Sequence, residues 1–168
     1  LRFILGLFDQ NGFSILSAAQ ALPDLVAEPG MLTGPHETQN EKDIHKADEV
    51  LALMSTADIG QAVVVENGLV LGVETLQGTD CLLQFVAETD PILRDSLKKG
   101  VLVKRPKNQQ DLRVDMPAIG PETINAVSKA GLAGIVISPH TVLLIEREKT
   151  LSLAAQKDIY IVARDAIS

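Results

Sequence analysis

The chain has 168 residues, of which 46% are hydrophobic and 22% charged, and this ordinary balance excludes a disordered or fibrous protein. Cys81 is the single cysteine, so no internal disulfide can form, and we expect it to be buried. The net charge of −7 and the aromatic content of 3% argue against nucleic acid as a partner, because a polyanion is repelled and few rings can stack on bases. No apolar run reaches the roughly 20 residues that span a bilayer, so we expect no transmembrane helix.

The first 40 residues look different from the rest of the chain. Residues 1–9 predict a short helix that ends at Asn11-Gly12, and Phe13–Leu16 predicts a strand. A polar stretch rich in Pro and Gly follows between residues 27 and 40 and is typical of a linker. We therefore divide the chain into residues 1–32 and a main domain of residues 33–168. Because it begins with Leu1 rather than Met, we expect it to be a fragment.

The main domain opens with a helix and a hairpin. Residues 41–55 predict an amphipathic helix, for which Asn40 is the expected cap. Two β-rich runs, 62–66 and 69–74, are joined by Asn67-Gly68, a pair that tolerates the positive φ angles of a type I′ turn. This pattern predicts a β-hairpin.

Short helices and buried strands then alternate to the end of the chain. We expect helices over 81–89, 121–130 and 151–157, and strands over 101–104, 135–137, 142–145 and 159–162. A hairpin combined with isolated buried strands predicts an α/β fold of the mixed α+β kind, in which helices cover a mixed sheet.

A basic segment stands out in this acidic chain. Residues 98–115 hold six basic residues against two acidic ones, a net charge of +4. Lys104 could neutralise phosphate oxygens there, and Arg113 could bind them bidentately. A solvated basic loop explains the same composition, and the residues alone leave both interpretations open.

Two acidic residues and one helix-opening tripeptide could complete an anion site. Asp111 and Asp115 lie within the basic segment, where a carboxylate stays ionised and can hold Mg²⁺ or orient a water molecule. Two Asp residues in a loop are also common turn formers. Gly78-Thr79-Asp80 follows a strand and opens a helix, so its N–H groups could bind an anion, or it could be a plain cap. The three histidines lack the spacing of zinc ligands.

Several of these pieces occur together in an order that resembles the UDP-2,3-diacylglucosamine pyrophosphatase family of lipid A biosynthesis, in a branch once described only as a domain of unknown function. The resemblance covers residues 1–168. Its matching stretches are Asp58–Val65, Glu74 with Gly78-Thr79-Asp80, Lys104 with Pro106, Gln110–Thr123 and Ala130–Gly134. Gln77 stands where the family pattern leads us to expect Glu, so we give that position no metal role.

The resemblance implies a two-domain enzyme with its substrate held between the domains. Residues 1–32 would be the end of an N-terminal nucleotide-binding α/β domain, and residues 33–168 the C-terminal α/β domain. The full-length enzyme would hydrolyse its lipid nucleotide to UMP and 2,3-diacylglucosamine 1-phosphate with Mg²⁺ or Mn²⁺, and water would attack the phosphorus nearer the sugar. We expect a cytoplasmic protein, with peripheral contact to the inner membrane and a homodimer as further expectations, and no activity from this chain alone.

The same resemblance and the chemistry of the residues suggest roles within the site. Asp115 is the expected catalytic carboxylate and, with Asp111, a metal ligand. The expected substrate-binding residues are Gly78, Thr79, Asp80, Lys104 and Arg113. Two alternatives belong to other classes: a non-catalytic module that binds a phosphorylated lipid or nucleotide, and a structural oligomerisation domain.

Overall fold

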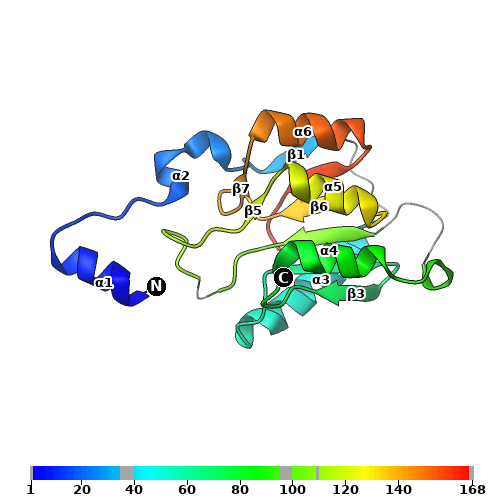
Figure 1. The fold of residues 1–168 in the computed structure, drawn as a ribbon, viewed down its shortest axis with the longest axis horizontal. Helices are drawn as coiled ribbons and strands as arrows, with labels where there is room; N and C mark the ends of the chain where they lie inside the picture. Colours follow the sequence, from blue (N-terminus) through cyan, green and yellow to red (C-terminus); the bar gives the residue numbers. More distant parts are fainter. Residues whose placement is uncertain (1, 35–39, 95–99, 109, 167–168) are drawn as a thin grey trace.

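A mixed sheet of six strands forms the centre of the computed structural model, which describes residues 2–34, 40–94, 100–108 and 110–166 (Figure 1). In spatial order the strands are β1 (Gly30–Thr33), β8 (Tyr160–Ala163), β6 (Gly134–Ile137), β4 (Val101–Lys104), β2 (Ala62–Glu66) and β3 (Leu69–Val73). Strands β8, β6 and β4 are parallel to one another, and the other neighbours are antiparallel. A small parallel pair, β5 (Ala118–Ile119) and β7 (Leu143–Leu144), lies outside this sheet.

Helices cover both faces of the sheet. On one face α3 (Glu41–Thr56) packs through Ile44 and Leu51 against a layer of valines from β2 and β4. On the other face α4 (Gly78–Ala87), α5 (Pro121–Lys129) and α6 (Arg147–Gln156) lie side by side (Figure 1). Successive strand residues point to opposite faces, so each central strand contributes to both apolar layers. The mixed α/β fold expected from the sequence is confirmed.

The predicted hairpin is present and is fixed to helix α3. Asn67 and Gly68 have φ angles of 52° and 78°, the left-handed geometry that this turn requires. The Asp43 carboxylate of α3 accepts hydrogen bonds from the backbone N–H of Asn67 at 3.0 Å and of Gly68 at 2.6 Å. The local turn geometry and the long-range contact with α3 therefore stabilise the same hairpin.

Some local predictions were wrong. Residues 13–16 form no strand and lie without regular structure, and their large apolar residues Phe13 and Leu16 are exposed. Helix α4 begins at Gly78, so Thr79 and Asp80 lie in its first turn instead of capping it. Cys81 is exposed rather than buried, because it borders a surface hollow beside α4. Asn40 makes no side-chain cap, because its Oδ1 accepts a hydrogen bond from the Tyr160 hydroxyl at 3.2 Å.

The N-terminal segment is helical at its start and lies apart from the sheet. Helix α1 (Arg2–Gln10) leaves Phe3 and Phe8 exposed, and Figure 1 shows it at the far end of an extended connection. Two short helices follow, α2 (Ala18–Ala21) and η1 (Pro23–Leu25), and a third, η3 (Pro91–Leu93), follows α4. The domain boundary drawn between residues 32 and 33 falls inside β1. Within the described ranges no helix is long and apolar enough to cross a membrane.

Candidate functional site

Polar side chains gather at the edge of the sheet where the three parallel strands end. Strand β4 ends with Lys104, and Ser138 and Arg164 follow β6 and β8. The end of β3 reaches the same edge, since Glu74 donates its backbone N–H to Ala62, the residue paired with Lys104. In open α/β sheets, ligands bind outside the carboxyl ends of the strands. This edge is therefore the candidate functional site.

A buried cluster of Glu74, Thr79 and Lys104 lies at this edge. The Lys104 ammonium donates a hydrogen bond to the Thr79 hydroxyl at 2.6 Å, and that hydroxyl donates to the Glu74 carboxylate at 2.5 Å. The ammonium and the carboxylate are 4.0 Å apart. Burial lowers the pKa of Lys104, while the negative charges of Glu74 and Asp80 act to raise it. The buried cluster thus fixes a cation beside the N-terminus of α4, which itself favours anions.

The backbone holds Glu74 in place from the other side. Gly60 has a φ angle of 43°, and a Cβ atom there would lie 2.0 Å from the carbonyl oxygen of Glu74. Only glycine allows this close approach. The sequence motifs include Glu74 but assign it no role. Its position as a lone carboxylate directly after an apolar strand could have indicated a site residue.

A second, exposed cluster contains Asp9, Asp111 and Arg113, and we call it the loop cluster. The Arg113 guanidinium donates to both carboxylate oxygens of Asp111, at 3.0 and 2.8 Å, and lies 3.5 Å from the carboxylate of Asp9 in α1. These hydrogen bonds and charges raise the pKa of Arg113. The side chain of Asp115, the predicted catalytic residue, is exposed, and its backbone N–H donates to the carbonyl of Asp111 at 3.0 Å.

The structure therefore divides the predicted site residues into two groups. Thr79 and Lys104 belong to the buried cluster, with Asp80 close enough to influence the Lys104 charge. Arg113 and Asp111 form the loop cluster, and Asp115 follows in the same loop.

In the part of the basic segment that the structure describes, the cations are paired with carboxylates. Lys98 and Lys99 fall outside the described residues. Each of the other four cations lies next to a carboxylate: Lys104 to Glu74, Arg105 to Asp48, Lys107 to Asp58 and Arg113 to Asp111. Lys104 and Arg105 are also buried. A solvated basic loop therefore does not describe Lys104 and Arg105.

The predicted metal ligands fit a divalent cation only in part. Mg²⁺ prefers carboxylate oxygens and is commonly held by one or two of them together with substrate phosphates. Asp115 offers such an exposed carboxylate, whereas both oxygens of Asp111 accept hydrogen bonds from Arg113. Among the described residues, no three His, Cys, Asp or Glu side chains gather as a metal-binding group.

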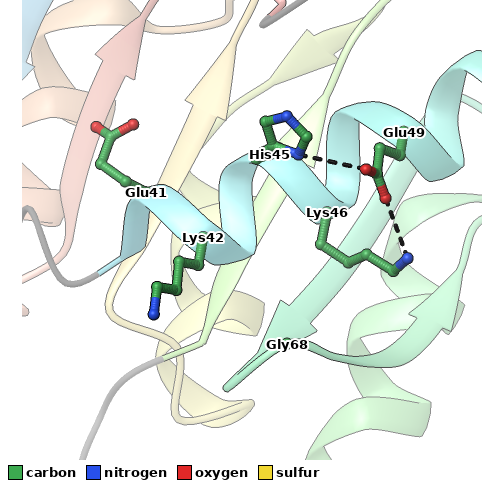
Figure 2. Close-up of a pocket in the computed structure, with 6 residues that line it drawn as sticks. All are labelled: Glu41, Lys42, His45, Lys46, Glu49 and Gly68. Carbon is green, nitrogen blue, oxygen red and sulfur yellow. Dashed lines mark hydrogen bonds and ion pairs between the residues drawn. The ribbon is translucent and has the colours of Figure 1, made fainter.

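Among the surface hollows, two are lined by residues that the structure describes. The larger, of about 570 Å³, lies over the outer side of α3 and the hairpin turn (Figure 2). Figure 2 shows that Glu49 is paired with both His45 and Lys46, and the Lys46 hydrogen bond lowers the pKa of Glu49. Its lining residues are Glu41, Lys42, His45, Lys46, Glu49 and Gly68, and none of them was predicted for the site.

The smaller hollow, of about 410 Å³, adjoins the start of helix α4. Its lining is largely apolar and includes Val73, Leu82 and Phe85, and Gly78 also borders it. Because Gly78 directly precedes Thr79, this apolar surface begins beside the buried cluster.

Comparison with known proteins identifies the family of this α/β domain. The sequence model of the LpxI C-terminal domain matches residues 28–162, and the chain belongs to this family. The UDP-2,3-diacylglucosamine pyrophosphatase LpxI of Caulobacter vibrioides is 36% identical over 168 residues. The alignment covers 98% of this chain and 60% of that relative, so the chain spans about three fifths of the relative's length. The family inferred from the motifs is confirmed, and all the predicted site residues lie within the matched range.

Proposed function

We propose that the full-length protein hydrolyses the pyrophosphate bond of UDP-2,3-diacylglucosamine, giving UMP and 2,3-diacylglucosamine 1-phosphate in lipid A biosynthesis. Family membership and the activity named for the Caulobacter relative support this proposal. The structural observation that carries it is the buried Lys104 ammonium, held by Thr79 at the N-terminus of α4. A fixed cation beside a helix N-terminus is suited to a phosphate group.

In the proposed reaction, water attacks the phosphorus nearer the sugar. The bond from that phosphorus to the bridging oxygen breaks, the bridging oxygen leaves with UMP, and the Asp115 carboxylate takes the proton from the water. Lys104, the backbone N–H groups at the start of α4 and Arg113 neutralise the phosphate oxygens. Arg113 binds phosphate by exchanging its hydrogen bonds with Asp111 for bonds to phosphate oxygens.

We include Mg²⁺ or Mn²⁺ in the proposal as the expected cofactor. Asp115 would hold the ion, which would supply Lewis-acid neutralisation of the pyrophosphate charge. Asp111 would be the second ligand, and its hydrogen bonds with Arg113 would compete with the ion for the same carboxylate.

We assign the acyl chains of this substrate to the apolar hollow beside α4. It starts at Gly78 and extends over Val73, Leu82 and Phe85, so a phosphate at Thr79 would leave an attached acyl group beside an apolar surface. Burial of apolar chain on such a surface contributes about 25 cal/mol for each Å² removed from water.

The test uses the full-length protein with UDP-2,3-diacylglucosamine and MgCl₂, and measures UMP release. Asp115→Asn is expected to abolish turnover while circular dichroism shows an unchanged fold. Asp90→Asn is the matched control, because the Asp90 side chain caps η3 by accepting from the Ile92 N–H and Asn can cap equally well. Normal turnover by Asp115→Asn would refute its catalytic role. Salt-dependent substrate binding without any turnover by the unaltered protein would favour the binding-module alternative.

A further inference from the structure

Arg105 makes the most extensive set of buried side-chain contacts at the candidate site. Its guanidinium binds the Asp48 carboxylate of α3 through two hydrogen bonds, at 2.6 and 3.1 Å. It also donates to the Ser138 hydroxyl at 3.2 Å, to the Arg164 carbonyl at 2.6 Å and to the Asp165 carbonyl at 3.5 Å. Asp48 and Arg105 are each at least nine-tenths buried.

These contacts connect the ends of all three parallel strands. Arg105 directly follows β4, Ser138 directly follows β6, and Arg164 directly follows β8. The backbone N–H of Arg105 also donates to the carbonyl of Gln61, just before β2, at 2.9 Å. One side chain therefore joins β4, β6, β8 and helix α3 at the edge where the site lies.

Along the chain, Arg105 connects the residues of the two clusters. Lys104, the preceding residue, points to the opposite face of the sheet and contacts Thr79 of α4. The loop of residues 106–117, which carries Arg113 and Asp115, begins directly after Arg105. This loop also contacts helix α3, since the Asn108 N–H donates to the Ser55 hydroxyl at 2.8 Å.

We propose that Arg105 is a positioning residue that aligns the loop carrying Asp115 with the phosphate-binding Lys104. This inference rests on the proposed function. Arg105 is sealed off by its protein partners and does not itself bind substrate. Loss of its fixed geometry lowers the rate of the chemical step, because small displacements of reacting groups are costly, whereas the charges that bind phosphate remain. The turnover number kcat therefore falls and KM stays nearly constant.

The experiment compares Arg105→Lys with Arg94→Lys in the full-length protein. Arg94 is a matched control because it is also largely buried, binds both oxygens of Glu66, at 3.3 and 2.5 Å, and donates to the Ala130 carbonyl at 2.6 Å. Glu66 directly follows Val65, which pairs with Val101 at the start of β4. The Arg94–Glu66 pair therefore lies at the opposite edge of the sheet from the candidate site. Lysine keeps the charge in both variants but loses the planar fork of donors.

We expect Arg105→Lys to lower kcat on the order of 100-fold, with KM changed by less than about threefold. Arg94→Lys should keep kcat within about twofold even if its melting temperature falls equally. Amide hydrogen exchange over residues 106–117 should become faster in Arg105→Lys only. An equal loss of kcat in both variants would show a merely structural role, and an unchanged kcat or unchanged exchange in Arg105→Lys would overturn the inference.

Two further outcomes are separated by the design. If the unaltered full-length protein releases no UMP, the proposed function fails, and exchange over residues 106–117 still decides whether Arg105 holds the loop. If Arg105→Lys does not fold, Asp48→Asn replaces it, since Asn has nearly the same shape and weakens the same pair. The same losses of kcat and of loop protection are then expected, and normal values of either would overturn the inference.

Discussion

The buried cluster and the loop cluster contain similar groups in different surroundings. Each pairs a cation with a carboxylate, but the side chains of Lys104 and Glu74 are 7% and 8% exposed, whereas that of Arg113 is 42% exposed. Water screens the exposed pair and leaves it free to exchange partners. The buried pair has its geometry fixed before substrate arrives, and such preorganised charge contributes most to catalysis. Under the proposed function, the buried cluster would be the fixed part of the phosphate site and the loop cluster its exchangeable part.

Replacement of Lys104 should have the largest effect. Lys104→Met keeps the length of the side chain but removes the fixed charge, so we expect kcat to fall about 10²–10³-fold, as for loss of one preorganised donor. UMP release by the full-length protein measures this, with circular dichroism to check the fold. A smaller loss than that caused by Arg113→Lys would reverse the order of importance given to the two clusters.

A change at Gly60 should damage the buried cluster through the backbone. In Gly60→Ala the new Cβ meets the Glu74 carbonyl and the φ angle of 43° is unfavourable, so we expect the free energy of unfolding to fall by about 3 kcal/mol, with reduced UMP release. Gly68→Ala is the control, because its φ is 78° but nothing lies within 4 Å, and about 1 kcal/mol is expected. Equal losses in urea unfolding would show that contact with Glu74 is unimportant.

Replacement of Arg113 should have a moderate effect on activity and a small one on stability. Arg113→Lys retains the charge but cannot bind a phosphate bidentately, so we expect kcat/KM to fall roughly tenfold. Because the side chain is exposed, the free energy of unfolding should change by less than about 1 kcal/mol. Steady-state kinetics and urea unfolding test both statements, and a large loss of stability would show that the loop cluster is structural.

The lowered pKa of Lys104 predicts a modest effect of pH on stability. The folded state releases this proton at a lower pH than the unfolded state, so the unfolded state binds more protons within the interval between the two pKa values. Stability should therefore rise with pH from the lowered folded pKa to about 10.4, the ordinary lysine value. The difference in urea unfolding between the unaltered protein and Lys104→Met should show this rise. A difference independent of pH would contradict it.

Much of the fold could be predicted because its signals are local. Hydrophobic periodicity located helix α3, and Asn67-Gly68 located the hairpin turn. The errors fell where tertiary contacts did not follow the local preference. The apolar residues of segment 13–16 had no neighbouring strand to pair with, and Thr79, a favoured capping residue, lies one residue inside α4. Motif order identified the family, because it depends on residue identities rather than on packing.

The sequence by itself determined the family, the mixed α/β fold class and most of the element types. Only the tertiary structure decided which charges meet. Lys104 and Arg105 are neighbours in a single basic run, yet strand alternation sends one to Glu74 and Thr79 and the other to Asp48. These partners lie 25 to 57 residues away in the chain, and their pairing depends on sheet order and register. Composition records the charges, but burial and distance determine their effect.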